Sequence, residues 1–255
     1  MLVPASAQSP VDVVLAYGLE EIESPGQDPW KAEKWEKKYA LDDLPVNVRI
    51  DKGKLVLAQR TTTKPAFPPE YETPSIRYVL TSADGGYASQ LHAVFRDGRP
   101  QLLVAMNVMA IVPRASDLVL FSAHMHMANT GEILRVASAD ASPRASLVTL
   151  LSEGPRVVLE RPGRSSDDRS HLYIVTYSSL MSVFMGRRGN VLKTHYKSPA
   201  FAGRFPSSAV FDKDHLVIGS STGVAVAKMQ QDIVVSVRYF ATKGRSVQLR
   251  PAPTK

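Results

Sequence analysis

One five-residue pattern, Lys54-Leu55-Val56-Leu57-Ala58, is written four times along this chain. It returns as Asp117-Leu118-Val119-Leu120-Phe121, His171-Leu172-Tyr173-Ile174-Val175 and His215-Leu216-Val217-Ile218-Gly219. Each copy begins with a polar residue, continues with Leu, and ends in residues that are mostly aliphatic or aromatic and favour a buried strand. A recurring strand unit that cannot bury its own faces predicts a stacked or radial all-β architecture.

The spacing of this pattern indicates how many units the chain repeats. Its leucines (Leu55, Leu118, Leu172 and Leu216) lie 63, 54 and 44 residues apart, and a propeller blade of four strands takes about 40–50 residues. The first interval is long enough to hold a further, degenerate blade. We therefore predict a β-propeller-like domain of four or five blades over residues 44–242. A β-sandwich is the alternative, because it would need no such repeat.

Apolar runs bounded by turn residues mark the individual strands that we expect. They lie at residues 46–50, 55–57, 76–82, 89–95, 101–108, 119–126, 133–137, 147–151, 157–160, 171–177, 180–185, 191–196, 209–211, 215–220, 223–229 and 233–240. Two loops stand out between them: a proline-rich connection over residues 64–75 and a polar, serine-containing loop over residues 161–170. Such loops on a rigid scaffold often carry contacts.

Residues 1–43 are expected to form an extension that precedes the β domain. Ala5-Ser6-Ala7 is typical of the small-residue cleavage site of a secretory signal peptide, so we interpret the first residues as a signal remnant. An ordinary N-terminus also fits these residues. An alternating apolar stretch at residues 11–17 predicts a strand, and an acidic turn is expected at residues 20–27.

One helix is expected, over residues 29–40. Asp28 is a favourable N-cap and Pro29 suits the first helical position. The residues that follow are mostly strong helix formers. At the other end of the chain, residues 243–255 are predicted to form a loose basic tail.

Composition narrows the class of protein. The 255 residues are 44% hydrophobic and 22% charged, which is typical of a globular chain. The absence of Cys excludes disulfides and thiolate metal sites. No apolar run approaches the roughly 18 residues that a membrane helix needs, so no integral membrane segment is expected.

The charge pattern does not indicate a nucleic-acid binder. The net charge of +7 suits an acidic partner, an anionic polymer or a membrane surface, but the basic residues are scattered between the strands, which is typical of ordinary solubility charge. Aromatic residues make up 7%, and no strand has the clustered basic and aromatic residues of a single-strand binder. Phosphate loops, dinucleotide fingerprints and zinc spacings are absent, so no cofactor is expected.

Three segments carry a resemblance to known proteins. Residues 205–229, which contain the phrase His215-Leu216-Val217-Ile218-Gly219, are similar to the last blade of exported bacterial β-propeller-like proteins. Residues 171–184 resemble a penultimate blade, and residues 122–136 an earlier one. The resemblance implies a propeller and transfers no catalytic residue. Some proteins of this kind act as immunity proteins that block toxins such as cell-wall hydrolases.

Candidate site residues fall into two groups. The two loops supply the partner-binding candidates: Phe67, Tyr71, Arg164, Asp167 and Asp168. In His124-Met125-His126-Met127 the two imidazoles would share one strand face and could bind a transition metal, although a third ligand must come from elsewhere and Met more often fills core gaps. No Gly-x-Ser-x-Gly elbow is present; Ser220 and Ser221 are expected in a turn.

These observations lead us to expect a monomeric, periplasmic or secreted, non-catalytic binding protein. Its most concrete form is an immunity or inhibitor protein that blocks a secreted bacterial toxin such as a cell-wall hydrolase. A hydrolase or lyase with a site in the central channel is one alternative, and a periplasmic copper- or metal-binding protein is the other.

Overall fold

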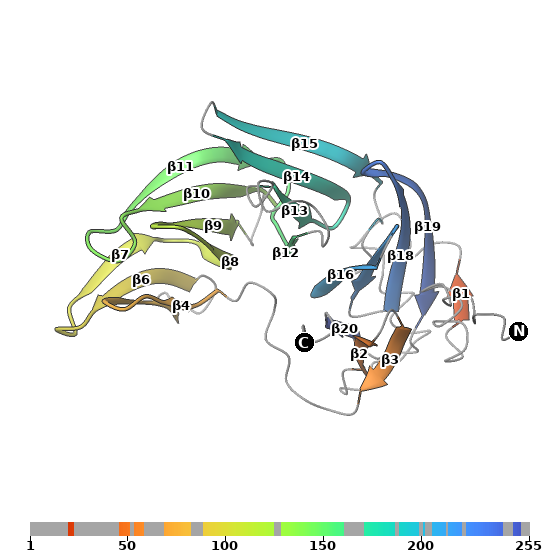
Figure 1. The fold of residues 1–255 in the computed structure, drawn as a ribbon, viewed down its shortest axis with the longest axis horizontal. Coiled ribbons are helices and arrows are strands. Elements are labelled where there is room, and N and C mark those ends of the chain that lie inside the picture. Colours follow the sequence, from red (N-terminus) through yellow and green to blue (C-terminus); the bar gives the residue numbers. More distant parts are fainter. Residues whose placement is uncertain are drawn as a thin grey trace, which may run out of the picture. The chain divides into compact units, whose positions relative to one another are not determined.

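The computed structural model of the chain is all-β in every segment that it describes (Figure 1). These segments are residues 20–22, 46–51, 54–58, 69–82, 89–124, 129–160, 171–186, 189–198, 201, 206–212, 214–220, 223–241 and 247–250. The expected helix at residues 29–40 and the signal remnant lie outside them. No helix among the described residues is long and apolar enough to cross a lipid bilayer.

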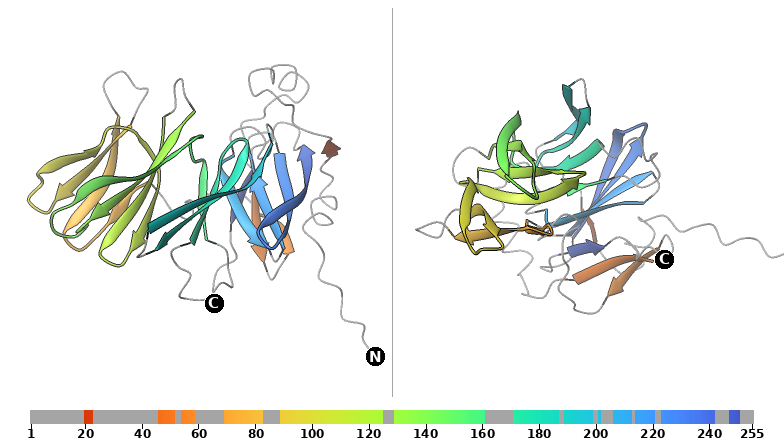
Figure 2. Two further views of the ribbon diagram at one scale, coloured as in Figure 1. Left: turned by 90° about the horizontal axis from the view of Figure 1, so that it is seen from above. Right: turned by 60° about the vertical axis from the view of Figure 1, so that its left-hand side comes forward.

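Four sheets follow one another along the chain, and each is built from four consecutive antiparallel strands (Figure 2). The first contains β4 (Tyr71–Glu72), β5 (Ile76–Ser82), β6 (Ser89–Phe95) and β7 (Pro100–Val104). The second contains β8 (Asn107–Arg114), β9 (Asp117–Ala123), β10 (Gly131–Ala137) and β11 (Arg144–Leu151). The third contains β12 (Val157–Leu159), β13 (His171–Val175), β14 (Ser179–Gly186) and β15 (Gly189–Lys197). The fourth contains β16 (Ser208–Asp212), β17 (His215–Gly219), β18 (Gly223–Gln230) and β19 (Ile233–Ala241).

This order of strands is that of propeller blades, and it confirms the predicted propeller-like, all-β fold. Each sheet is a simple meander in which sequential strands are hydrogen-bonded neighbours. A sandwich would instead distribute its strands between two sheets through long connections. A smaller fifth sheet has the order β20 (Val247–Arg250), β2 (Val46–Asp51), β3 (Lys54–Ala58).

The recurring leucine pattern occupies the same position in three of the sheets. Its last three copies begin β9, β13 and β17, and each of these is the second strand of its sheet. The first copy is β3 (Lys54–Ala58), in the smaller sheet. The long first interval does contain an extra blade, β4–β7, whose second strand β5 lacks the pattern.

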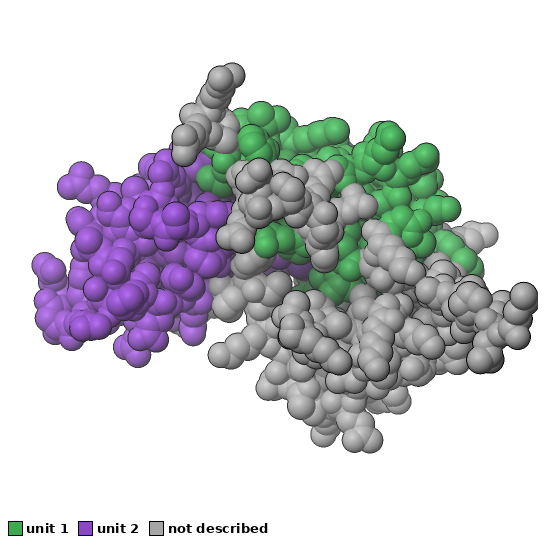
Figure 3. Space-filling view, in the orientation of Figure 1, with its two compact units in different colours: residues 1–63, 159–255 green, residues 64–158 purple. Residues whose placement is uncertain are grey.

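The chain divides into two compact units, coloured separately in Figure 3. Residues 64–158 form unit 2, and residues 1–63 with 159–255 form unit 1. Unit 2 contains the first two sheets, which pack face to face over a shared core. That core consists of Ile76, Tyr78, Leu91, Ala93, Val104, Val108, Ile111, Leu118, Leu120, Leu134, Val136 and Ala139.

The burial pattern of β5 differs from that of β9, β13 and β17, the second strands of the other three sheets. In β9, β13 and β17 every residue after the first is buried, so both faces of these strands are covered. In β5, Ile76 and Tyr78 are buried while Arg77 is exposed, so only one face is covered. This alternation explains why β5 does not carry the continuous apolar pattern.

The smaller sheet in unit 1 joins distant parts of the chain and corrects the predicted loose tail. β20 (Val247–Arg250) pairs in parallel with β2 (Val46–Asp51), so these residues are a strand. Val247 and Leu249 alternate with polar Gln248 and Arg250, which is a strand pattern that the basic flanks concealed.

A second correction concerns the expected acidic turn at residues 20–27. Glu20–Ile22 form β1, which pairs antiparallel with β19 and adds a fifth strand to the fourth sheet. Glu has a low propensity for β-strands, so the pairing with β19, rather than the local sequence, decides the conformation of these two glutamates.

A third correction concerns the strand predicted at residues 101–108. The structure divides this region into β7 and β8, with Ala105 and Met106 between them, and β8 continues to Arg114. The run from Leu102 to Val112 holds one polar residue, Asn107, and neither Gly nor Pro, so no turn signal marks the change of sheet. The strand expected at 119–126 likewise ends at Ala123.

Candidate functional site

Tyr71 is the one partner-binding candidate that the structure describes. It lies on β4, pairs with Tyr78 of β5, and packs half-buried against the core of unit 2. Its segment was expected to be a loop and is in part this short strand. Phe67 and the three candidates of the second loop, Arg164, Asp167 and Asp168, lie outside the described residues.

The predicted metal ligand His124 is exposed directly after β9. Its backbone N–H donates to the Thr130 carbonyl at 2.9 Å, which closes the β9–β10 connection. His126 lies outside the described residues, so the pairing of the two imidazoles stays a prediction. Within the described segments, no three His, Cys, Asp or Glu side chains are grouped to hold a metal ion.

Among the described residues of unit 1, several titratable and aromatic side chains contact one another, and we name them the Tyr173 cluster. It consists of His171, Tyr173, Ser182, His195, Phe211 and Asp232. The Tyr173 hydroxyl on β13 donates to Asp232 Oδ1 at 2.8 Å, and both side chains are buried. This bond joins the third sheet to the turn between β18 and β19 of the fourth.

That turn holds Asp232 in an unusual backbone conformation. Gln231 and Asp232 have φ values of 48° and 68°, which is the left-handed region that a two-residue hairpin turn requires. Neither residue is Gly, and such conformations cost about 1 kcal/mol or more each. The buried bond to Tyr173 is therefore one of the contacts that hold the strained turn in place.

Ser182 and His195 form the second polar pair of the cluster. Ser182 Oγ on β14 lies 2.7 Å from His195 Nε2 on β15, and His195 Nδ1 is buried. Burial lowers the pKa of His195 below its ordinary value of 6.5, and Lys193 and His171 lower it further, whereas Asp232 opposes the shift. The imidazole is therefore neutral at neutral pH.

Aromatic rings surround Tyr173 on several sides. The His171 ring stacks on it at 5.0 Å with an interplanar angle of 12°, and Phe211 meets it edge-on at 5.0 Å. The His195 ring lies 5.6 Å away. Phe211 belongs to β16, so these contacts also bridge the third and fourth sheets.

A serine beside a neutral histidine is the pair that nucleophilic hydrolysis uses. Here Ser182 is only 2% exposed, so its hydroxyl is covered. Asp232 accepts a hydrogen bond from the Tyr173 hydroxyl, and its charge also acts on His195. The contacts of the cluster thus tie two sheets together.

Sequence reasoning missed this cluster because its members are scattered over 62 positions from His171 to Asp232 with no local motif. The available signal was weak: Tyr173, Ser179 and Ser182 interrupt otherwise apolar strands and are buried. A buried polar side chain needs a partner. The identity of that partner follows from strand packing, which the sequence does not give.

Unit 2 has a polar contact of the same kind. The Tyr78 hydroxyl donates to the Ala139 carbonyl in the turn between β10 and β11. The neighbouring Asp140 accepts from the Ser75 N–H at 2.9 Å. Burial, and then the charge of Asp140, raises the pKa of Tyr78. The first and second sheets are joined by this turn.

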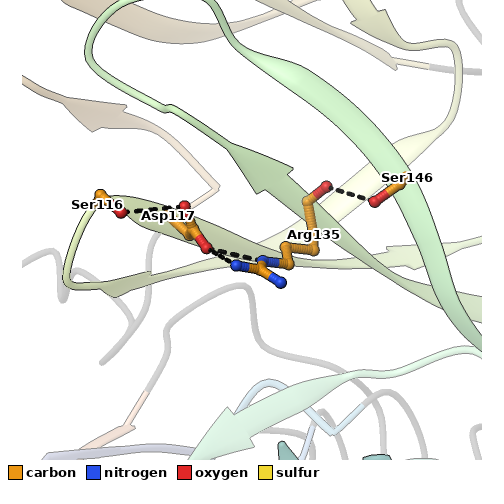
Figure 4. A network of polar contacts seen from close by, with 4 residues as sticks. All are labelled: Ser116, Asp117, Arg135 and Ser146. Carbon is orange, nitrogen blue, oxygen red and sulfur yellow. Dashed lines mark hydrogen bonds and ion pairs between the residues drawn. The ribbon is translucent and has the colours of Figure 1, made fainter. Parts of the chain in front are cut away.

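An exposed ion pair lies at the start of β9 (Figure 4). Arg135 on β10 donates from Nε to Asp117 Oδ2 at 2.7 Å, and Ser116 donates to Asp117 Oδ1 at 3.2 Å. Partial burial alone would raise the pKa of Asp117, but the bond and charge of Arg135 outweigh it and lower the pKa. The Arg135 side chain is 56% exposed, so the pair contributes little to stability.

Comparison with known proteins gives only remote likenesses. No family model and no curated protein matches the chain. A functionally unknown protein from Desulfotomaculum acetoxidans DSM 771 is 11% identical, with a TM-score of 0.39 over 77% of this chain and 61% of that chain. An ACO/RPE65 chimera is 10% identical, with a TM-score of 0.37 over 70% of this chain and 51% of that chain.

A glucose dehydrogenase is 10% identical, with a TM-score of 0.26 over 69% of this chain and 89% of that chain. The chain spans less than two thirds of the length of the first two structures. All three TM-scores lie below 0.5, so these likenesses carry no argument about the fold or the function.

Proposed function

We propose that this chain is a non-catalytic binding protein, and most concretely a periplasmic immunity or inhibitor protein that blocks a secreted toxin such as a cell-wall hydrolase. The observation that supports a binding role is the position of the exposed large apolar side chains. Among the described residues these are Leu102, Leu147, Leu150, Phe184, Val191, Leu192, Ile233 and Val235. All except Phe184 lie on the fourth strand of a sheet, which is a rigid and outward position.

Apolar side chains on rigid strands suit contact with a protein. Single exposed apolar residues are ordinary, but their concentration on one type of strand gives each blade an apolar outer border. The loop candidates Phe67, Tyr71, Arg164, Asp167 and Asp168 add the anchor and charged side chains that an inhibitor inserts into a cleft. Residues 205–229 resemble the last blade of exported bacterial β-propeller-like proteins, some of which act as immunity proteins, and this supports the same role.

The test uses the purified full chain and a secreted hydrolase whose gene neighbours its own. We expect a stable 1:1 complex in size-exclusion chromatography and loss of peptidoglycan cleavage at equimolar inhibitor. Replacing Asp167 and Asp168 with Lys should weaken the complex, whereas Asp97→Lys, in an exposed turn of unit 2, should not. A hydrolase that neither binds nor loses activity in the presence of the chain would overturn the toxin proposal.

A hydrolase is the second candidate, and one observation favours it: the 2.7 Å contact between Ser182 and His195. The burial of Ser182 opposes it. A fluorophosphonate probe distinguishes the two proposals, because an activated serine is labelled covalently. Labelling that disappears in Ser182→Ala would establish the hydrolase, and an unlabelled chain would exclude this pair as its nucleophile.

A further inference from the structure

β15 is the outer strand of the third sheet. Eight of its nine residues pair with β14 on one side, with His195 skipped at a register shift, and in the part of the chain that the structure describes no strand pairs with its other side. It contains no Pro, so each of its residues has both a backbone N–H and a backbone C=O. An edge of this length is a template for an added strand.

The fourth sheet of the same unit already carries such an added strand. There the acidic segment β1 pairs with β19, with Glu20 opposite Ala241, Glu21 opposite Phe240 and Ile22 opposite Tyr239 (Figure 1). β19 is the fourth strand of its sheet, as β15 is of the third. The molecule therefore contains one example of a fourth strand that an acidic, apolar segment covers.

The side chains of β15 suit a segment of similar chemistry. Lys193 and Lys197 are exposed, and the strand has no Asp or Glu. Val191 is 60% exposed and Leu192 is 38% exposed. An incoming strand would thus meet two positive charges and an apolar border, and both acidic and apolar side chains on that strand would be matched.

The other fourth strands suit an acidic segment less well. β11 exposes Leu147 and Leu150 but has a single cation, Arg144, at its first position. β7 has five residues and begins with Pro100, which has no N–H to donate. On β19, β1 already pairs with residues 239–241, and the strand carries a single cation, Arg238. Among these strands, β15 therefore combines the most positive charge with a long unpaired edge, and it suits an acidic segment best.

We propose that the outer edge of β15 receives an extended, acidic and apolar segment of a partner protein as an additional β-strand. This inference rests on the proposed binding function and names the surface and the partner chemistry for it. Backbone hydrogen bonds would supply affinity, while Lys193 and Lys197 would select acidic segments.

The probe is a fluorescent synthetic peptide of alternating Glu and Val, matched to the nine residues of β15, titrated into the full chain. We expect saturable binding by fluorescence anisotropy. Binding should weaken about tenfold when Lys193 and Lys197 are both replaced by Glu, since two charge contacts become repulsive. The matched control replaces Arg144 on β11 and Lys228 on β18 with Glu, and it should change affinity by less than about twofold.

Two further peptides test for backbone pairing rather than simple charge attraction. One carries N-methyl groups on its odd residues and the other on its even residues, so that each removes the N–H groups of one edge. Strand addition requires one peptide to lose binding while the other retains it. Hydrogen exchange should also slow within residues 189–197.

Equal binding of both methylated peptides, protection at β11 or β19 instead of β15, or no binding at all would overturn the inference. The proposed function is tested separately by the hydrolase complex. If the hydrolase complex forms and the Lys193 and Lys197 replacements do not weaken it, the proposed function holds, and the hydrolase contacts a surface other than β15. If the peptide binds β15 but no hydrolase complex forms, the proposed inhibition of a toxin is wrong and the proposed strand-binding surface on β15 still holds.

Discussion

Tyr173 and Asp232 are separated by 59 positions in the sequence and share a buried hydrogen bond of 2.8 Å. Tyr78 and Ala139, separated by 61, are joined in the same way in unit 2. At the residue scale, then, each unit uses a buried tyrosine hydroxyl to fix a turn of the next sheet. Because removing one partner leaves the other buried and unsatisfied, such bonds are sensitive to single substitutions.

Tyr78→Phe removes the hydroxyl and leaves the Ala139 carbonyl without its donor. We expect the free energy of unfolding to fall by about 1–3 kcal/mol, measured by urea denaturation. Tyr71→Phe is the matched control on the adjacent position of β4, where the side chain is only half-buried, and its effect should stay within about 0.5 kcal/mol. Equal effects of the two replacements would contradict the account.

Gly131→Ala places a methyl group where no room exists. A Cβ there would lie 2.6 Å from Pro155 Cδ and 2.6 Å from the Ser122 carbonyl oxygen. We expect a loss of about 3 kcal/mol in urea denaturation, or failure to fold. The control is Gly98→Asn, at φ 83° with open space around it, where only backbone strain opposes the change and the loss should be about 1 kcal/mol.

Adding Pro155→Ala to Gly131→Ala should restore part of the lost stability, because it removes the ring that the new methyl group meets. A Gly131→Ala protein as stable as the wild type would show that the β10 and Pro155 segments are not packed as described.

His195 predicts a pH dependence of stability. Its pKa is lowered in the folded protein, so the unfolded chain takes up the proton first as the pH falls. Stability is therefore complete above about pH 6.5 and declines as the pH falls from there toward the lowered pKa. Thermal melts at pH 7.5 and 5.0 should show a smaller decline in His195→Gln than in wild type. An NMR titration that placed the His195 pKa at or above 6.5 would contradict this.

At the scale of the element, the sequence predicts most strands because apolar periodicity reports burial directly. β5 and β6 have the predicted bounds, 76–82 and 89–95. The division between β7 and β8 was not predictable, since no Gly or Pro marks it. β1 and β20 were missed for another reason: their neighbours, β19 and β2, are remote in sequence, and pairing decides their conformation.

Leu172 lies on an inner strand and Leu192 on an outer strand of the third sheet, so replacing each by Ala compares how much the two positions contribute to stability. Leu172 on β13 is fully buried, so Leu172→Ala should cost about 2–5 kcal/mol of unfolding free energy. Leu192 on β15 is 38% exposed, and Leu192→Ala should cost less than about 1 kcal/mol. Urea denaturation of both variants tests whether the leucine pattern marks the inner strands. A reversed order of the two losses would refute it.

At the scale of the whole molecule, the repeat predicted the series of propeller-like sheets but not the polar contacts between them. The residues that form these polar contacts come from strands and turns of different sheets, and no regular spacing in the sequence predicts which of them meet. The distribution of exposed apolar residues likewise became visible only when each strand had a place in its sheet. Local sequence patterns therefore predict the fold class of this chain, but they do not predict the candidate contact surfaces.

Hydrogen exchange of the full chain, followed by mass spectrometry, tests the central claim most directly. The claim is that the last three leucine-centred strands, β9, β13 and β17, are inner, doubly paired strands of successive sheets, and that the outer strands remain open to partners. The account predicts the slowest exchange in β9, β13 and β17, and faster exchange in β7, β11 and β15, whose backbones are paired on one side. Exchange in β9, β13 and β17 as fast as in the outer strands would contradict it.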